Sequence, residues 1–572
     1  MSSKPILGID LGTTYSLVAV LQDGKPVVLP NGLGELLTPS AVSLDDDGRV
    51  LVGAAARARA VTHPERSAMS FKRDMGSDKV YELAGKKFTP QDLSALVLRA
   101  LKLDAEKALG RTIDEAVVTV PAYFGDAQRQ ATRAAGRIAG LHVERIINEP
   151  TAAAMAYGLH ERNRELRAAV LDLGGGTFDV TILEIIEGVI EVQASAGDSR
   201  LGGDDFDEAL GKRFAVQIQA DHQVDAAKDV KAWARLRQSA EMAKKQLSET
   251  DKAQIALYEL AVGGKTLSLE MSVTRAEAEA EWAPLLDRIR GIVVRALRDA
   301  NLKPTQIDEV LLVGGSTRLP CVGRLASQLF GRLPLRKLPP DEAVAMGAAV
   351  QAALKQGDAA VDDLVVTDIA PFSLGTSSMS RMGPLEITGV FVPIIERGTV
   401  IPCSRSKPFV TSQDEQTSIT VDVYQGEHPM AAHNTKLGEY AVKDIPAGPS
   451  GQEGVDIRFS YDLNGIIEVE TTVRSTGKKA QLVIEQSPGR LTAAQIEEAR
   501  AAMARLKFHP QEALPNVTAL SRADALYMAL TGAERAHLGE LIAHFRAALA
   551  AQDDKLIGAT RERLLAVVGR HR

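Results

Sequence analysis

Two turns of nearly the same sequence lie in the first third of the 572-residue chain. Residues 8–14 and 171–177 each place the tripeptide Asp-Leu-Gly at the end of a short apolar segment, and Gly or Thr residues and a further apolar segment follow. Apolar segments interrupted by glycine-rich turns are typical of buried strands. The repetition predicts two half-domains of one architecture, and it constrains the fold more than any other feature.

Strand-like and helix-like segments alternate up to about residue 357. The strand candidates are short, rich in Val, Ile and Leu, and bounded by Gly, Asp or Pro, and such alternation predicts α/β layers. The expected strands are Pro5–Asp10, Ser16–Leu21, Ala116–Val120, Ala169–Asp172, Val180–Glu184 and Val310–Val313. The expected helices are Pro90–Leu109, Gly125–Ala139, Trp233–Leu247 and one or two helices within Arg275–Asp299.

The pattern changes near residue 360. Between about 370 and 488 the sequence favours strands, with period-two alternation in Ile419–Val423 and the hairpin signal Asn464-Gly465, so we expect an antiparallel β domain. The chain then becomes helical. Capping boxes predict helix starts at Thr492, with Gln495, and at Thr531, with Glu534.

Composition excludes several classes of protein. The length corresponds to roughly three to four domains of about 150 residues each. A net charge of -7 leaves no dominant basic surface, so we expect no nucleic-acid partner. No apolar run approaches the ~18 residues of a membrane helix, so we expect no membrane association. No secretory signal is visible, and the only cysteines, Cys321 and Cys403, suit a reducing cytoplasm.

The paired turns carry the strongest chemical signal. Glycines let the backbone approach a phosphate closely, and Thr hydroxyls add hydrogen-bond donors. An Asp at the end of each strand, Asp10 and Asp172, can hold Mg²⁺ beside the phosphates, usually through water. Two such turns from two half-domains predict a clamp for a nucleoside triphosphate.

Two further glycine turns lead to opposite interpretations. Residues 313–318 follow an apolar strand and would admit a flat purine ring, with Arg318 stacked on it. Gly263-Gly264-Lys265-Thr266 resembles the end of a phosphate-binding P-loop, but Glu259 stands where the first glycine is required. We therefore interpret residues 263–266 as a hairpin turn.

These motifs resemble, in order, the five signatures of the superfamily that contains actin, sugar kinases and heat-shock ATPases. The closer resemblance is to the DnaK, or seventy-kilodalton heat-shock protein, chaperone family, and it extends over nearly the whole chain. Several segments, including residues 71–77 and 393–397, are similar to the shorter bacterial HscC-type branch. The matching motifs are Gly8–Ser16, Thr119–Phe124, Ile147–Gly158, Asp172–Asp179, Leu201–Asp207 and Val313–Pro320.

The resemblance implies four parts. Residues 1–360 would form an actin-like α/β ATPase domain of two lobes, with a duplicated ribonuclease-H-like fold. Residues 361–369 would be an interdomain linker, 370–488 an antiparallel β-sandwich that binds substrate, and 489–572 a shortened helical lid. The linker's aliphatic run departs from the family pattern because it ends at Thr367.

The resemblance also implies the roles of individual residues. Catalysis would involve Lys72, Glu149, Asp179, Thr177, Asp10 and Asp172, with Asp10 and Asp172 holding Mg²⁺ through water. Phosphate contacts would come from Gly12, Thr13, Thr14, Tyr15, Gly174 and Gly175. Purine and ribose contacts would come from Gly202, Gly203, Glu241, Lys244, Lys245, Ser248, Gly314, Gly315, Ser316, Arg318 and Asp341. The spacing of Glu241, Lys244, Lys245 and Ser248 places these four on one helical face.

Further residues match the parts that couple the domains. Nucleotide state would be relayed by Pro121, Arg129, Leu364, Val365 and Val366. The peptide groove would be lined by Met379, Phe391, Phe409, Ser412, Ile419 and Val421, although some of these apolar residues would equally suit the sandwich core.

The predicted function is that of an ATP-dependent molecular chaperone of the stress response, whose ATPase cycle controls its affinity for extended apolar peptides of unfolded proteins. Expected ligands are ATP or ADP and Mg²⁺, and expected partners are client peptides and a J-domain co-chaperone, with the need for a nucleotide exchange factor left open. We expect a cytoplasmic monomer. Two alternatives remain: a small-molecule kinase of the same superfamily and an actin-like filament protein.

Overall fold

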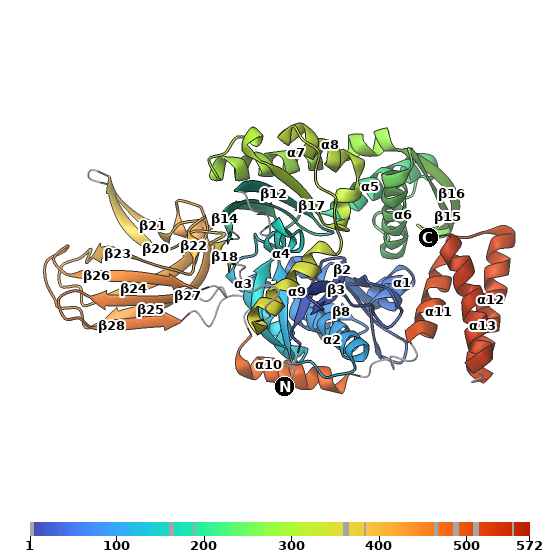
Figure 1. Cartoon of the computed structure of the whole chain (residues 1–572), viewed down its shortest axis with the longest axis horizontal. Coiled ribbons are helices and arrows are strands. Elements are labelled where there is room, and N and C mark those ends of the chain that lie inside the picture. The colour runs from blue at the N-terminus through green and yellow to red at the C-terminus, as the bar shows by residue number, and fades with distance from the viewer. Residues whose placement is uncertain are drawn as a thin grey trace.

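The computed structural model describes residues 5–159, 165–186, 189–357, 365–382, 385–462, 467–483, 491–506, 514–551 and 554–571. Two α/β lobes occupy the centre, an all-β unit lies at one end, and C-terminal helices lie against the lobes (Figure 1). No described helix is long and apolar enough to cross a membrane.

The first lobe is built on a mixed sheet. Its central strand β1 (Leu7–Asp10) pairs antiparallel with β2 (Tyr15–Gln22), which continues into β3 (Lys25–Val28). On its other side β1 pairs parallel with β10 (Glu115–Val120), and β10 with β11 (His142–Asn148). The helices α2 (Pro90–Leu109) and α3 (Asp126–Ile138) bury apolar residues against this sheet.

The second lobe repeats this strand order. Strand β12 (Leu166–Leu173) pairs antiparallel with β13 (Phe178–Ile186), which continues into β14 (Val189–Asp198), and it pairs parallel with β17 (Glu309–Val313). The sequence repeat at residues 8–14 and 171–177 therefore falls at equivalent places, where β1 and β12 end. Helices α5 (Gly203–His222), α6 (Val230–Glu249), α7 (Arg275–Asp299) and α8 (Pro320–Phe330) surround this sheet.

Two helices with small side chains join the lobes. On α9 (Ala343–Gln356), Gly347 lies so close to α4 (Glu149–Ala156) that an added Cβ would be 1.7 Å from the carbonyl oxygen of Ala152. Gly8 of β1 meets the backbone of α9 in the same way. Because alanines of both helices share one core with apolar residues of both sheets, this seam holds the lobes together at their base.

Most of the expected elements form within a few residues of their predicted limits. The segment Arg275–Asp299 is one helix despite Pro284. Gly263 and Gly264 form the turn of the antiparallel hairpin β15 (Lys252–Val262) and β16 (Lys265–Thr274), which confirms that they do not belong to a P-loop.

The linker lies against the second lobe. Strand β18 (Val365–Val366) adds to the edge of β14 in parallel, with Val189 opposite Val365, and the Thr367 amide donates to the Ile190 carbonyl. Leu364, expected to act with these valines, lies outside the described residues. The next strand, β19 (Asp368–Ile369), pairs with β22 (Val400–Ile401), so strand pairing continues from the lobe into the β unit.

The β unit is a sandwich of two four-stranded antiparallel sheets. Alternate apolar residues of both sheets meet in one core that includes Val421, Val455 and Phe459. The first sheet has the order β21 (Leu385–Ile395), β20 (Leu374–Met382), β24 (Ser418–Gln425), β25 (Thr435–Lys443). The second has the order β23 (Cys403–Val410), β26 (Gly454–Tyr461), β27 (Ile467–Val473), β28 (Lys479–Val483). Asn464 and Gly465 lie outside the described residues.

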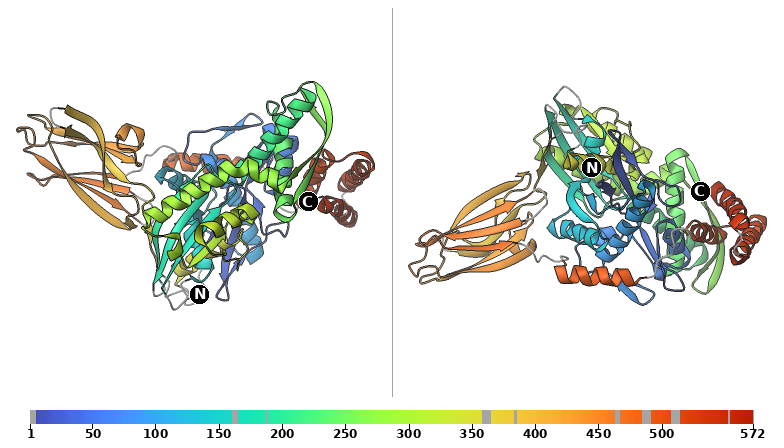
Figure 2. Two further views of the ribbon diagram at one scale, coloured as in Figure 1. Left: turned by 90° about the horizontal axis from the view of Figure 1, so that it is seen from above. Right: turned by 60° about the horizontal axis from the view of Figure 1, so that its bottom comes forward.

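The C-terminal helices lie against the lobes rather than over the sandwich (Figures 1 and 2). Helix α10 (Ala493–Arg505) opens with the expected Thr492–Gln495 capping box and buries Ile496 and Met503 in the core of the first lobe. Helices α11 (Leu514–Tyr527), α12 (Gly532–Ala551) and α13 (Asp554–Arg570) share a small core of their own beside the opposite end of the lobes.

Candidate functional site

The two Asp-Leu-Gly turns face each other between the lobes. An added Cβ on Gly175 would lie 1.7 Å from the Oγ1 of Thr14, and one on Gly176 would lie 2.5 Å from the side chain of Thr13. The Oγ1 of Thr14 is buried and has no hydrogen-bond partner in the described structure. Only glycines permit this approach, and the Thr14 hydroxyl remains available to a ligand.

The second turn is held in place by neighbouring loops. The Gly174 amide donates to the Thr177 carbonyl over 3.2 Å, which closes the turn. The Gly174 carbonyl in turn accepts hydrogen bonds from the Gly203 amide at 2.9 Å and from the Ser316 hydroxyl at 2.9 Å. An added Cβ on Gly202 would meet the Gly175 backbone at 2.6 Å. The loops predicted to hold phosphate and purine therefore form one connected cradle.

A buried acidic cluster lies next to this cradle. Lys72 Nζ is 2.7 Å from Glu149 Oε1, and both side chains are buried. Asp10 ends β1 and accepts a hydrogen bond from Thr119, while Asp172 and Asp179 belong to β12 and β13. The predicted catalytic carboxylates from both lobes thus converge around a single lysine.

Burial, followed by the neighbouring carboxylates, raises the pKa values of these carboxyl groups. Burial, with a further contribution from Glu149, raises the pKa of Asp10 to about 7 and that of Asp179 to about 8. Burial followed by Glu149, Asp179 and Asp10 raises the pKa of Asp172 well above 3.8. One lysine does not neutralise four carboxylates, and a divalent cation with phosphates is the type of ligand that does.

The predicted purine end is closed by an ion pair between the lobes. The guanidinium of Arg57, on α1 (Ala54–Thr62) of the first lobe, donates to Glu241 Oε2 of α6 over 2.6 Å. It also lies over the Tyr15 ring, 4.9 Å from the ring centroid. Although burial opposes ionisation, Arg57 and Lys245 hold the pKa of Glu241 below its ordinary value. Glu241, Lys244 and Ser248 on the charged face of α6 are therefore half-buried, whereas Lys245 is exposed.

The other predicted purine contacts surround the same place. Lys244 Nζ lies 3.0 Å from the Gly203 carbonyl and 2.8 Å from Asp207. Arg318 donates from Nε to Asp341 over 3.0 Å, and an added Cβ on Gly315 would be 2.6 Å from the same carboxylate. Gly314 has a φ of 82°, which favours glycine, and Ser248 bonds back to the Lys244 carbonyl.

Sequence reasoning missed two arginines. Arg57 completes the closure over Glu241, and Arg73 donates to the Gly175 carbonyl and to Asp205 across the lobes. The only sequence signal for Arg57 was the charged face of α6, because a carboxylate such as Glu241 needs a cationic partner when it is removed from water. Arg73 stands next to Lys72 in the sequence, and no spacing pattern distinguished it.

Pro121 and Arg129 lie between the acidic cluster and the linker. The Pro121 carbonyl accepts from the Phe124 amide, and the Phe124 carbonyl accepts from Arg129 Nε. Arg129 also donates to Asn148 Oδ1 over 2.6 Å, and Asn148 Nδ2 donates to Asp368 over 2.5 Å. Two of the predicted relay residues are thus joined to the linker by side chains that the prediction had not named.

The predicted peptide residues occupy different environments in the sandwich. Val421 is fully buried in the core, Phe391 is 9% exposed, and Ser412 is exposed. Met379 is partly exposed at the register shift between β20 and β21, where a bulge re-aims a side chain. Phe409 and Ile419 pack on the edge of the core. Val421 therefore does not reach a peptide in this conformation.

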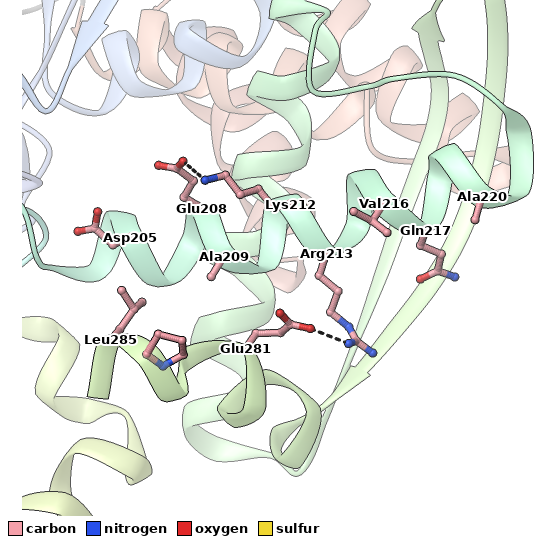
Figure 3. A pocket seen from close by; sticks show the side chains of 11 residues that line it. Asp205, Glu208, Ala209, Lys212, Arg213, Val216, Gln217, Ala220, Glu281 and Leu285 are labelled. Carbon is pink, nitrogen blue, oxygen red and sulfur yellow. Dashed lines mark hydrogen bonds and ion pairs between the residues drawn. The ribbon is translucent and has the colours of Figure 1, made fainter. Parts of the chain in front are cut away.

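A separate groove lies on the outer face of the second lobe, between α5 and α7 (Figure 3). Its volume is about 740 Å³, and ion pairs such as Lys212–Glu208 and Arg213–Glu281 border it. It contains none of the predicted phosphate or purine residues, so it is not the candidate nucleotide site.

The duplicated lobes, the two facing phosphate turns and the buried carboxylates define a nucleotide-binding protein of the two-lobed ATPase class. A model of the Hsp70 protein family matches residues 6–82 and 79–561. The chain therefore belongs to the Hsp70 family. Membership implies an ATPase with ATP-dependent chaperone activity, since members of this family bind ATP or ADP with Mg²⁺, client peptides and J-domain co-chaperones.

The residues present fit Mg²⁺ and a nucleotide. Thr14 offers a hydroxyl without a partner, the glycines leave room for phosphates, and Asp10 and Asp172 supply oxygen donors of the type that Mg²⁺ prefers. Among the described residues, no group of three His, Cys, Asp or Glu side chains is arranged to hold a metal ion directly.

Proposed function

We propose that this protein hydrolyses ATP between its lobes and uses nucleotide state to control the affinity of its sandwich for extended apolar peptides. The proposal rests most on one junction. Glu149 pairs with Lys72 beside the phosphate turns, and its chain neighbour Asn148 bonds to Asp368 at the start of the sandwich. A movement of Glu149 on phosphate binding or hydrolysis would therefore act directly on its chain neighbour, which makes the interdomain contact.

Hydrolysis depends mainly on positioning and charge. Mg²⁺, when bound with the nucleotide, would neutralise charge that develops on the phosphates. Lys72 would face the terminal phosphate, and Glu149 and Asp179 would orient the attacking water. Thr13, Thr14, Tyr15 and Thr177 would donate to the phosphates, and Gly12, Gly174 and Gly175 would leave the space for them. Hydrogen-bond donors fixed in a buried site in this way stabilise transition-state charge by several kcal/mol.

The other end of the nucleotide would occupy the cradle beyond these turns. Glu241, Lys244, Lys245 and Ser248 of α6 would contact the ribose and base on one side. Arg318 and Asp341 would enclose the base from the opposite side. The backbone at Gly202, Gly203, Gly314, Gly315 and Ser316 would leave room for the ring.

We infer that the linker is the coupling element. Strand β18, with Val365 and Val366, docks on β14, and the sandwich is attached through Asp368 and through Gln425, whose side chain accepts from the Asp126 amide over 3.2 Å. With the helices away from the sandwich, this arrangement suits the ATP-bound, low-affinity state. Hydrolysis would release the linker, together with Leu364, and close the peptide site. The two ligands would then change each other's affinity reciprocally.

The peptide would bind at the exposed margin of the sandwich. Met379, Phe391, Phe409 and Ile419 would supply apolar contacts and Ser412 a polar one, with Val421 supporting them from the core. An extended peptide would satisfy its main-chain groups there while its apolar side chains enter a pocket.

The finer assignments belong to the same proposal. The segments at residues 71–77 and 393–397 are similar to those of the HscC-type branch. We propose a monomeric cytoplasmic chaperone of the stress response that works with a J-domain partner.

The direct test is release of a fluorescent unfolded peptide, followed by anisotropy after ATP is added. We expect ATP to speed release by about ten-fold or more, since coupling of 1–3 kcal/mol is typical of allosteric proteins. The Lys72→Met variant should still respond to ATP binding but should fail to return to slow release by hydrolysis. Peptide release that is the same with and without ATP would contradict the proposal.

A further inference from the structure

Helix α11 is anchored on the first lobe. Val517 packs against an apolar patch of that lobe formed by Ala41, Leu51, Ala55 and Ala56, two of which belong to α1. Next to this contact, Arg522 donates to both carboxylate oxygens of Glu35, at 2.9 and 3.0 Å. Both side chains of this pair are mostly buried, which makes the contact part of a packed interface.

The same helical bundle is also anchored on the second lobe. Arg235 of α6 donates to the carbonyls of Tyr258 and Glu259, where a register shift between β15 and β16 turns the backbone toward it. The same Nη2 that bonds to Tyr258 also donates to the carbonyl of Met528, just after α11. Only 6% of Arg235 is exposed, and hydrogen bonds of a buried cation are stronger than those of neutral groups. Arg535 of α12 adds an ion pair with Glu259.

These anchors belong to one compact body. Leu530, Leu538, Ile542 and Phe545 share a core with Leu564 of α13, so α11, α12 and α13 move together. The views of Figures 1 and 2 agree that this bundle lies beside the hairpin β15–β16 and α1. A bundle with its own core cannot stretch, so separation of the two lobes at this place breaks one set of anchors.

The bundle contacts the two elements that close over the nucleotide site. Helix α1 carries Arg57 and helix α6 carries Glu241, the ion pair between the lobes. Val517 packs beside α1, and Met528 is bound by Arg235 of α6. Because the lobes are joined at their base by α4 and α9, a nucleotide leaves when α1 and α6 move apart.

We propose that the α11–α13 bundle is an intramolecular latch across the nucleotide cleft, which slows release of bound nucleotide by holding the two lobes together. This inference rests on the proposed nucleotide-binding function and adds a regulatory role for the C-terminal helices, which is separate from covering a peptide. The partner of this surface on both lobes is the chain's own C-terminus.

The test is the dissociation rate of a fluorescent ADP analogue from the full-length protein, measured by stopped flow after a chase with unlabelled ADP. Arg522→Glu places a second negative charge against Glu35, and Arg535→Glu places one against Glu259. Neither arginine touches the nucleotide site. We expect the double variant to release ADP about ten-fold faster, which corresponds to about 1.4 kcal/mol. Restoring opposite charge with Glu35→Arg and Glu259→Arg should return the rate to near the wild-type value.

The control is Arg458→Glu, which makes the same charge reversal in an Arg–Glu pair on the sandwich, where Arg458 meets Glu470. Its release rate should equal that of the wild type. Release from the double variant within two-fold of wild type, or failure of the charge exchange to restore slow release, would overturn the latch alone. A wild-type protein that binds no ADP would overturn the proposed function and the latch together.

Discussion

The side-chain amide of Asn148 donates a hydrogen bond to the carboxylate of Asp368 over 2.5 Å and thereby joins the ATPase domain to β19, the linker strand that leads into the sandwich. The guanidinium of Arg129 donates a hydrogen bond to the side-chain oxygen of the same Asn148 over 2.6 Å. Asp368 is half-buried in this contact, and burial raises the pKa of its carboxyl group. Glu149, the next residue of the chain, faces the phosphate turns.

Removing this contact should uncouple the domains. In Asp368→Ala we expect the stimulation of ATP hydrolysis by an unfolded peptide to fall several-fold, because a buried hydrogen bond to a charged group contributes roughly 1.5–3 kcal/mol. Turnover assays with and without peptide measure the effect. Asp422→Ala, which removes the partner of Lys436 on the sandwich surface, is the control and should keep its stimulation. Full stimulation in Asp368→Ala would rule out this route of coupling.

Loss of Lys72 should affect both catalysis and folding. Lys72→Ala leaves Glu149 buried without its partner, and breaking a buried ion pair typically costs about 3–5 kcal/mol. Turnover should fall by roughly 10²–10³-fold, as for loss of one preorganised electrostatic group. Adding Glu149→Gln should recover much of the thermal stability but none of the activity. Recovery of turnover by the second change would show that Lys72 has no catalytic role.

A single methyl group should block the cradle. In Gly175→Ala the new Cβ would collide with the Thr14 hydroxyl, so the turns cannot close as they do in the native structure. We expect at least a hundred-fold loss of ATP affinity, about 2.7 kcal/mol, by titration calorimetry. Gly291→Ala is the control, since an added Cβ on Gly291 in α7 meets nothing within 4 Å. Equal affinity in both variants would contradict the placement of the phosphate turns.

Asp104 should give the first lobe a characteristic pH dependence. Burial raises its pKa to about 6, although the Gly32 amide donates to it over 3.1 Å. Between pH 4 and 6 the folded state keeps a proton that the unfolded state has released, so stability falls as pH rises through this window. Asp104→Asn does not titrate and should be more stable than wild type at pH 7 by on the order of 2 kcal/mol. Thermal unfolding at pH 4.5 and 7 measures this, and equal slopes for the two proteins would refute it.

The sequence was most informative where local chemistry and backbone pattern agree. The repeated Asp-Leu-Gly turns anticipated the meeting of Thr14 and Gly175, because equivalent strand ends of a duplicated fold converge on one cleft. The predicted cap at Thr492 is a local hydrogen bond, and such bonds depend on few distant residues.

Contacts between distant segments could not be predicted in this way. Nothing near Arg57 or Arg235 in the sequence indicates Glu241 of another lobe or the Met528 carbonyl of another domain. The alternating pattern of Ile419–Val423 fits a strand that lines a groove and a strand that faces a core equally well. Only the packing of the two sheets places Val421 in the core. The sequences of α11 and α12 likewise do not indicate which surface of the lobes these helices contact.

The central claim is most directly tested by the rate of ATP hydrolysis with and without a saturating unfolded peptide that contains no acceptor for phosphoryl transfer. A coupled chaperone should hydrolyse ATP several-fold faster with peptide, and the stimulation should fall several-fold in Asp368→Ala. A hydrolysis rate that does not change with peptide would contradict the account. If that rate instead rises with a sugar that becomes phosphorylated, the protein is a kinase, and if hydrolysis accompanies formation of a sedimentable polymer, it is a filament protein.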